Sequence, residues 1–446
     1  MFYRQTKITN FKEQIVKELK VGIIGFGTVG AGVASCLLKN ESVIADRTGV
    51  CAKLHKIADL DITTDRGVQV PDGILTTNVE ELLESCDIVV ELIGGTTIAR
   101  KFILDALNRG KSVVTANKAL IAQFGPELFE AAEKNGADLW FEASVGGGIP
   151  IIKSLRESFV GNRIESIYGI LNGTCNYIFT RMEREKLGFA DVLADAQRLG
   201  YAEANPALDI DGFDTAHKAS ILAALAYGNW YGMDPVYVEG IRNVSLTEIN
   251  YAQELGYRIK LLAILKQNAD GKTEIRVHPT LIPQSSPVAG ISEVFNGVMV
   301  NGDYVGKTLF YGRGAGREAT ASAVVADIVD VALDLANGCL RRIPGIKADA
   351  KKAETVSMDE IESRYYLRIQ VQDKPGVLGS IATLLSASNI SIDSLMQRPA
   401  GEEAGDVSII ILTHLAVEKN VRTAISQIEA LAEVEGAVTL LRIEDI

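Results

Sequence analysis

The chain has 446 residues, which predicts about three domains of roughly 150 residues each. Hydrophobic residues make up 47% and charged residues 23%, a globular balance that excludes disorder as the main state. A net charge of −12 argues against a protein that binds the nucleic-acid backbone, so we expect no nucleic-acid partner. The five cysteines are scattered without a C-x-x-C spacing, so we expect no disulfide framework and no structural zinc site. The start of the chain has no apolar signal region and no apolar run approaches the roughly 20 residues of a bilayer span, which predicts a cytoplasmic protein without a membrane partner.

The first block, which we place at residues 1–142, alternates short apolar runs with amphipathic stretches. Buried runs separated by helices are typical of βαβ units and a mainly parallel sheet. The predicted strands are 19–24, 54–60, 88–92, 112–115 and 139–142, and the predicted helices are 79–84, 102–108 and 126–135.

A glycine motif follows the first predicted strand, and it consists of Gly25, Phe26, Gly27, Thr28, Val29 and Gly30. In a dinucleotide-binding loop the first glycine permits the tight turn and the second lets the backbone approach the pyrophosphate. The third lets the next helix pack on the strand, with its N-terminus facing the phosphates. The position of the motif between a strand and a helix favours this interpretation over a purely structural turn.

The choice between NAD and NADP rests on the end of the second predicted strand. Asp59 and Asp61 lie there, later than the usual spacing, and a carboxylate at this place binds a ribose hydroxyl and repels a 2′-phosphate. Lys53 and Arg66 flank the strand and can instead accommodate a 2′-phosphate. The balance favours NAD slightly, and both coenzymes stay open.

Three polar segments follow predicted strands and carry Thr96, Lys118 and Glu142. In an open α/β sheet ligands gather at the carboxyl ends of the strands. Thr96 can therefore line the cofactor crevice, and Lys118 is either a solvated lysine or an ammonium at the reacting centre. The glycine-rich segment 142–150 is either a simple turn or a site where Glu142 and backbone carbonyls hold a hard cation.

A second group of polar residues lies at 200–218 and includes Asp214 and Lys218. These two side chains are four residues apart at the start of an apolar predicted helix, 215–227, and so share one face. One interpretation is an ordinary surface ion pair. The other is a cleft in which the lysine gives a proton to a carbonyl oxygen while carboxylates hold a substrate ammonium. The spacing of the acids does not fit a calcium loop, and we interpret His217 and His278 as structural.

The remaining blocks are a middle region, a linker and a small C-terminal domain. We place an α+β substrate and dimerisation domain at 143–345, with helix 317–335 returning to the first domain, and a linker at 346–364. Residues 365–446 follow the order βαββαβ of a ferredoxin-like fold, with elements at 366–371, 378–388, 390–398, 407–414, 421–432 and 437–442. An acidic hairpin is expected between the second and third of its strands.

Taken together, these motifs resemble the homoserine dehydrogenases that carry a C-terminal ACT domain. The resemblance runs from residue 20 to 446 and leaves the first 19 residues unexplained. Its matching pieces are 25–30, 92–95, 115–120, 142–150, 171–177, 200–206 with Asp209, Asp214 and Lys218, and 312–316.

The resemblance implies a role for each matching position. Lys218 is expected to give the proton to the substrate oxygen, with Lys118 as a second lysine beside it. The residues implied in substrate binding are Glu203, Asp214, Gly200 and Tyr201. Those implied in cofactor binding are Gly25, Phe26, Gly27, Thr28, Val29, Gly30, Thr96, Lys118 and Gly316. Those implied in holding a monovalent cation, usually sodium, are Glu142, Val145, Gly147 and Ile149.

The activity implied by the resemblance is reversible reduction of L-aspartate-4-semialdehyde to L-homoserine with NADP or NAD. This step belongs to threonine, methionine and isoleucine biosynthesis. The ACT domain implies feedback inhibition by L-threonine and at least a dimer, either a homodimer or a homotetramer. Two alternatives stay open: an amino-acid sensor on an inactive dehydrogenase scaffold, and a dehydrogenase for another amino or oxo acid.

Overall fold

A computed structural model describes residues 17–340, 342, 346, 354–399 and 406–446. The fold separates into two compact units. The first unit takes its described residues from Met1–Glu157 and Ala315–Asp349, and the second from Ser158–Gly314 and Ala350–Ile446. Predictions for residues 1–16, for 347–353 in the linker and for 400–405 in the acidic hairpin lie outside the described residues.

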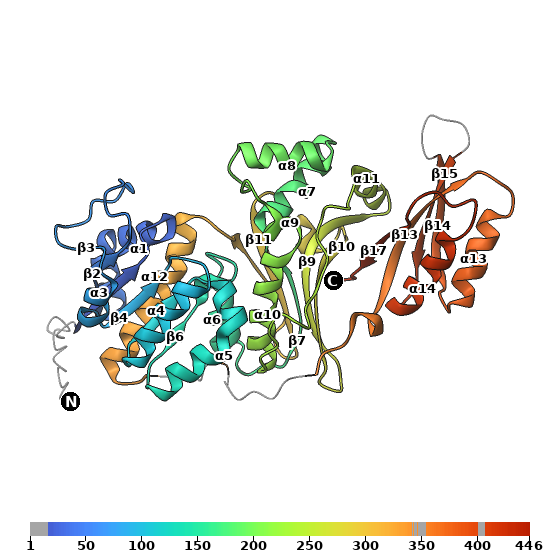
Figure 1. The fold of residues 1–446 in the computed structure, drawn as a ribbon. Helices are drawn as coiled ribbons and strands as arrows, with labels where there is room; N and C mark the ends of the chain where they lie inside the picture. Colours follow the sequence, from blue (N-terminus) through green and yellow to red (C-terminus); the bar gives the residue numbers. More distant parts are fainter. Residues whose placement is uncertain (1–16, 341, 343–345, 347–353, 400–405) are drawn as a thin grey trace, which may run out of the picture. The chain divides into compact units, whose positions relative to one another are not determined.

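The first unit is built on a parallel six-stranded sheet with the order β3-β2-β1-β4-β5-β6, which confirms the predicted Rossmann-type fold (Figure 1). Its strands are β1 (Lys17–Ile24), β2 (Val50–Ala58), β3 (Leu75–Thr76), β4 (Ile88–Glu91), β5 (Ser112–Thr115) and β6 (Leu139–Trp140). Its helices are α1 (Thr28–Lys39), α2 (Glu41–Thr48), α3 (Val79–Ser85), α4 (Thr97–Asn108), α5 (Lys118–Lys134), η1 (Glu142–Ser144), α6 (Ile151–Lys153), η2 (Ser154–Ser158) and α12 (Arg317–Asn337).

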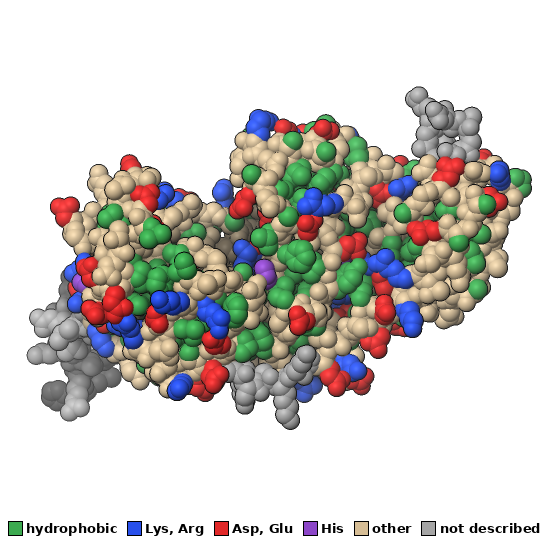
Figure 2. Space-filling view, viewed as in Figure 1, with side chains coloured by type: hydrophobic (Ala, Val, Ile, Leu, Met, Phe, Trp, Pro, Cys, Tyr) green, Lys and Arg blue, Asp and Glu red, His purple; other side chains and the backbone are tan. Residues whose placement is uncertain are grey.

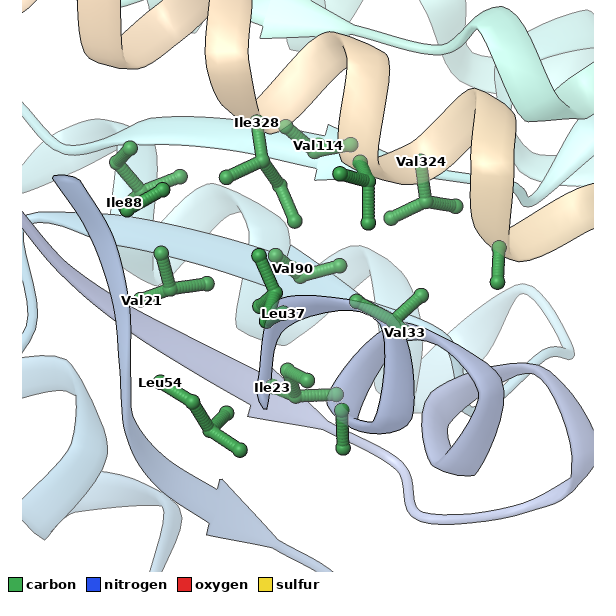
Figure 3. Packing of buried hydrophobic residues seen from close by; sticks show 14 of the residues in the cluster. Val21, Ile23, Val33, Leu37, Leu54, Ile88, Val90, Val114, Val324 and Ile328 are labelled. Carbon is green, nitrogen blue, oxygen red and sulfur yellow. The ribbon is translucent and has the colours of Figure 1, made fainter. Parts of the chain in front are cut away.

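The core of this unit lies between the sheet and two helices that are distant in sequence. Figure 3 shows Val33 and Leu37 of α1 and Val324 and Ile328 of α12 directed toward the strands. All four side chains are at most 2% exposed. Burying side chains of this size stabilises the fold by about 1.5–3 kcal/mol each. Helix α12 is thus an integral part of the dinucleotide-binding fold, although it follows β6 by more than 170 residues.

The end of the sheet differs from the prediction. The sequence pattern extends the last strand to Glu142, but β6 ends at Trp140 and Glu142 begins a 3-10 turn. The backbone N–H of Glu142 donates to the Asp327 carboxylate at 2.8 Å instead of to a neighbouring strand. A contact with helix α12, invisible in local sequence, therefore ends the strand.

Helix α5 starts earlier than predicted. The sequence pattern places its start at Pro126, whereas the helix begins at Lys118 and contains the proline. The Asn117 side chain accepts the Leu120 amide at 3.1 Å and caps the helix. Lys118 is consequently the first residue of a helix that starts at the carboxyl end of β5.

The second unit contains a mixed eleven-stranded sheet whose main path has the order β12-β11-β7-β9-β10-β17-β13-β15-β14. Its strands are β7 (Ile164–Ile170), β8 (Tyr237–Val238), β9 (Tyr257–Gln267), β10 (Thr273–Pro283), β11 (Phe295–Gly302), β12 (Gly306–Arg313), β13 (Glu362–Gln372), β14 (Ile392–Pro399), β15 (Asp406–Thr413), β16 (Ala416–Val417) and β17 (Thr439–Ile443). Its helices are α7 (Gly173–Glu185), α8 (Phe189–Arg198), α9 (Ala207–Ile210), α10 (Phe213–Tyr227), α11 (Leu246–Glu254), η3 (Pro287–Gly290), η4 (Met358–Glu360), α13 (Val377–Ala387) and α14 (Glu418–Glu429).

The C-terminal part of this unit follows the order β13-α13-β14-β15-α14-β17, which confirms the predicted βαββαβ fold. Its strands are arranged β17-β13-β15-β14, and the helices α13 and α14 pack on a common core with Tyr365 and Ile411. Strand β17 also pairs in parallel with β10, through Thr280 with Arg442 and Leu281 with Ile443. The sheet therefore runs without a break from the C-terminal part into the middle of the chain.

In the part of the chain that the structure describes, no helix is long and apolar enough to cross a membrane. On the face drawn in Figure 2, acidic and basic side chains are interspersed over both units.

Candidate active site

The glycine loop between β1 and α1 has the geometry that the motif predicted. Gly25 has a φ of 104°, and a Cβ there would lie 2.9 Å from the Leu92 carbonyl oxygen. A Cβ on Gly30 would lie 2.0 Å from the Gly25 carbonyl oxygen, so α1 packs directly on the turn. A Cβ on Gly27 would meet no atom within 4 Å. The middle glycine thus faces open space in which a pyrophosphate can approach the backbone.

Asp59 supports this loop from the end of β2. Its carboxylate accepts the backbone N–H of Phe26 and, through its other oxygen, the N–H of Asp61 at 2.9 Å. Asp59, which the sequence predicts as a ribose ligand, therefore supports the glycine loop. Because both carboxylate oxygens of Asp59 already accept a backbone amide, fewer lone pairs are left to accept a hydrogen bond from a ribose hydroxyl.

The two basic residues near β2 have different environments. Lys53 pairs with the exposed Glu18 at 3.0 Å, and both lie toward the amino ends of their strands. This placement argues against Lys53 as a 2′-phosphate ligand, because cofactors bind at the carboxyl ends. Arg66 lies beyond the carboxyl end of β2 and pairs with Asp61 at 3.1 Å. The Asp61 carboxylate accepts hydrogen bonds from the backbone and side chains of Thr64 and Thr63, and these bonds lower its pKa.

Glu91 joins the loops after β4 and β5, and sequence reasoning did not assign it a role. It is fully buried, and its Oε1 accepts the N–H groups of Ile93 at 2.8 Å and Gly94 at 3.3 Å. Its Oε2 accepts the Thr115 hydroxyl at 2.8 Å. The signal that could have found it is a lone acid at the end of an otherwise apolar strand.

The two loops that Glu91 joins carry two predicted site residues. Thr96 precedes α4, Lys118 opens α5, and both residues are partly buried. The Asn117 amide donates to the Gly95 carbonyl at 2.6 Å and so ties the loops together a second time. Gly316 has a φ of 116° at the start of α12, in the same unit as these loops.

The predicted cation segment places a carboxylate in a buried turn. Glu142 is 4% exposed, and its two carboxylate oxygens accept the amides of Ile152 at 2.9 Å and Lys153 at 2.6 Å. Burial raises the pKa of Glu142 to about 7. Gly147, in the turn beside it, has a φ of 54°. Among the described residues, no group of three or more His, Cys, Asp or Glu side chains is arranged to hold a metal ion, so a cation here would depend on backbone carbonyls.

In the second unit, Asp214 and Lys218 form a buried ion pair rather than a surface pair. Lys218 Nζ donates to Asp214 Oδ2 at 2.7 Å and to the Leu171 carbonyl at 2.6 Å, and both side chains are at most 10% exposed. The Asn172 amide donates to Asp214 at 2.9 Å and to Asp209 at 2.7 Å. Burial raises the pKa of Asp209. Asn172 and Asp209 lie in the motifs that match the family, but no local pattern in the sequence predicts a role for either of them.

The other predicted substrate residues lie on the turn before α9. Tyr201 and Glu203 are exposed, and Gly200 has a φ of 78°. The Tyr201 carbonyl accepts the Thr174 hydroxyl at 2.9 Å, and its ring lies 4.7 Å from the Tyr177 ring. The turn is therefore attached to the first residues of α7, which follow Asn172, but Glu203 does not share the buried environment of Asp214 and Lys218.

Comparisons with known proteins cover all three parts of the chain. Residues 25–142 match the family described as the NAD-binding domain of homoserine dehydrogenase, residues 150–329 match homoserine dehydrogenase, and residues 365–433 match the ACT domain. The homoserine dehydrogenase of Neisseria gonorrhoeae is 46% identical over 97% of this chain and 100% of its own length. That of Pseudomonas aeruginosa is 45% identical over the same shares.

The chain is also similar to solved structures of homoserine dehydrogenases. A homoserine dehydrogenase from Thiobacillus denitrificans matches with a TM-score of 0.91 at 45% identity, covering 96% of this chain and 99% of its own. A hyperthermophilic archaeal homoserine dehydrogenase in complex with NADPH matches with a TM-score of 0.60 at 29% identity, covering 74% of this chain and 100% of its own. With a glycine loop on a Rossmann-type sheet and full-length relatives of one kind, this chain belongs to the homoserine dehydrogenases, NAD(P)-dependent oxidoreductases, and it carries a C-terminal ACT domain.

Proposed function

We propose that the chain reduces L-aspartate-4-semialdehyde reversibly to L-homoserine and that Lys218 gives the proton to the substrate oxygen. When bound, a reduced nicotinamide would supply the hydride to the aldehyde carbon. The carbonyl oxygen takes up the proton, so the aldehyde becomes a primary alcohol. The observation that carries the proposal is the buried ion pair of Lys218 and Asp214.

The geometry of Lys218 supports this role. An ammonium has three N–H donors, and two of them are directed at Asp214 and the Leu171 carbonyl. The third is available to a substrate carbonyl oxygen. Asn172 holds the same Asp214 oxygen, so the direction of the ammonium is set by two elements, α7 and α10. A donor held in place in this way contributes to catalysis because its position needs no reorganisation during the reaction.

The remaining residues would bind the cofactor and the substrate. We assign the dinucleotide to 25–30, Thr96, Lys118 and Gly316, with Lys118 near the reacting carbon. We assign the amino-acid portion to the turn with Gly200, Tyr201 and Glu203 and to Asp214, whose carboxylates would attract an ammonium. Glu142 with the carbonyls of Val145, Gly147 and Ile149 would hold a sodium ion, because a buried carboxylate and backbone carbonyls are the oxygen ligands that a hard cation prefers.

Steady-state kinetics with aspartate semialdehyde test the catalytic proposal. Lys218→Ala is expected to lower kcat by roughly 10²–10⁴. The KM for the dinucleotide should stay unchanged, because the glycine loop belongs to the other unit. Asp214→Asn should raise the KM for the semialdehyde. Normal turnover in Lys218→Ala would reject the assignment and make Lys118 the next candidate.

The coenzyme preference and the regulation are also proposed. Arg66 beyond β2 favours NADP, and Asp59 and Asp61 favour NAD, so parallel turnover with both coenzymes decides between them.

For the ACT domain we propose L-threonine as effector and assembly into at least a dimer. A starting point is the turn before α13, where Gly376 has a φ of 96° and the helix N-terminus can face a carboxylate. Asp393, on the strand that follows α13, pairs with Arg364 at 2.9 Å. Light scattering measures the molar mass in solution and so tests the proposed assembly into at least a dimer.

A further inference from the structure

The seam between β10 and β17 contains a buried arginine that binds both sides of it. Arg442 of β17 is fully buried and donates to the Glu418 carboxylate of α14 at 3.0 and 2.6 Å. Its Nη1 donates to Glu239 at 2.8 Å, and its Nη2 lies 3.2 Å from the Tyr237 hydroxyl. Glu418 belongs to the ACT domain, whereas Tyr237 and Glu239 belong to the segment at β8. One guanidinium therefore links the ACT domain to this segment.

The β8 segment, residues 237–241, lies between β10 and the turn that begins α10. On one side the Glu239 N–H donates to the Val277 carbonyl of β10 at 2.7 Å. On the other side the Ile241 N–H donates to the Ile210 carbonyl at 2.8 Å. A Cβ on Gly212 would lie 3.0 Å from a Val238 methyl group. The segment thus forms one wall of the turn, with little space for either to move alone.

That turn carries the substrate residues of α10. Gly212 is the N-cap, and Asp214 lies in the first helical turn with Lys218 one turn later. Arg242, which follows the segment, pairs with Asp211 at 3.0 Å and attaches it to the turn again. A shift of the segment would therefore be transmitted to Asp214 and Lys218.

We propose that Arg442 is a positioning residue for substrate binding. From the ACT domain it holds Tyr237 and Glu239, and through the β8 segment it sets the place of the turn that carries Asp214 and Lys218. The inference rests on the substrate-binding role proposed above for these two residues.

The chemistry of the seam suits positioning better than stability. Two buried charges gain little net stability from pairing, since their desolvation offsets the attraction. The planar guanidinium can bind two carboxylates in fixed directions, which a lysine ammonium cannot do. An arginine between Glu418 and Glu239 therefore sets a distance and an orientation between two parts of the sheet.

Two variants each remove one of the contacts between Arg442 and the β8 segment. In Tyr237→Phe and Glu239→Ala, Arg442 keeps both hydrogen bonds to Glu418, so the ACT domain is expected to fold. We expect the KM for aspartate semialdehyde to rise by about 3- to 30-fold, the range typical of residues that act through a coupled network. The KM for the dinucleotide should change little.

Lys266→Gln is the matched control. Lys266 of β9 pairs with Glu444, just beyond β17, at 2.8 Å, so it also links the ACT domain to the rest of the sheet, but it is not part of the β8 segment. This variant should leave the KM for the semialdehyde unchanged. Arg442→Lys should raise that KM, and should add little to it when combined with Glu239→Ala.

The outcomes separate the inference from the proposed function. An unchanged semialdehyde KM in both Tyr237→Phe and Glu239→Ala would overturn the inference, and so would an equal rise in Lys266→Gln. Asp214→Asn and Lys218→Ala are measured in the same assay. Normal kinetics in these two variants would reject the proposed function instead.

Discussion

At the scale of single residues, carboxylates at the carboxyl ends of strands organise the loops proposed to bind the cofactor. Glu91 accepts two backbone amides of one loop and the Thr115 hydroxyl that leads into the next. Asp59 does the same for the glycine loop through Phe26. Such hydrogen bonds to a carboxylate are stronger than neutral ones and have defined directions. Backbone that must receive a cofactor is thereby held in shape before the cofactor binds.

Glu91→Gln tests this role. The substituted amide has one acceptor oxygen in place of two, so it can accept the Ile93 and Gly94 amides or the Thr115 hydroxyl but not both. The free energy of unfolding should therefore fall by about 1–3 kcal/mol. The KM for the dinucleotide should rise, because the loops that carry Thr96 and Lys118 lose their common support. Chemical denaturation and steady-state kinetics measure the two effects.

Glu127→Gln is the control for Glu91→Gln. Glu127 pairs with Arg100 on the surface and is 41% exposed, so its loss should change stability by no more than about 0.5 kcal/mol. If both variants behave alike, Glu91 has no special role in the loops.

At the scale of elements, strand β9 contains a buried lysine whose hydrogen-bond partners are neutral. Lys260 is 2% exposed and donates to the Asn176 side chain of α7 and to the Ile291 carbonyl, at 2.9 and 2.5 Å. It thus joins β9 to the helix that follows Asn172. Burial lowers the pKa of Lys260 to about 8.

This pKa predicts how stability depends on pH. The unfolded chain keeps the lysine proton until about pH 10.5, whereas the folded chain releases it near pH 8. Between these values the unfolded state binds more protons, so this residue makes stability rise with pH. Urea denaturation from pH 7 to 10 should show the rise in the wild type, and the difference from Lys260→Met should shift by up to about 3 kcal/mol. Parallel curves for the two proteins would contradict the shifted pKa.

The turn at Glu142 gives a prediction for cation removal. A sodium ion bound only by the folded state adds about 2.7 kcal/mol of stability at a concentration of 100 Kd. Dialysis into buffer free of sodium and potassium should lower the activity and the melting temperature, and sodium chloride should restore both. Choline chloride at equal ionic strength is the control. Restoration by choline would mean that ionic strength, rather than a bound cation, is responsible.

At the scale of the whole molecule, the ACT domain shares a sheet with the substrate part of the chain. Strand β17 lies between β10 and β13, and Glu444 beside it pairs with Arg276, which is 1% exposed. Deleting the ACT domain would leave Arg276 and the edge of β10 without these partners. Deletion is therefore expected to disturb folding and substrate binding as well as regulation, so point variants in the full chain are the better test.

Gly376→Ala tests the effector site in this way. The φ of 96° at Gly376 strains any residue with a Cβ, so the turn before α13 should change shape and inhibition by L-threonine should weaken. Gly379→Ala is the control, since a Cβ there meets no atom within 4 Å. Initial rates with increasing threonine measure the effect. If the unmodified protein is insensitive to threonine, the threonine proposal fails.

The sequence by itself determined the features that arise from local spacing. The glycine loop and the shared face of Asp214 and Lys218 depend on backbone geometry over a few residues, and the structure contains both. The βαββαβ order follows from a succession of such local patterns, and the structure contains it as well. Helix starts were less predictable: Pro126 suggested a boundary, but the cap at Asn117 starts the helix earlier.

Only the tertiary structure decided which local groups meet. The burial of Lys218 depends on Asn172 and Leu171 at the start of α7, more than forty residues earlier. Glu91 acquires its role from a strand that pairs with its own, and Arg442 from a parallel pairing of β17 with β10. The physical reason is that sheet register and helix packing bring distant residues together, and no short spacing in the sequence encodes that register.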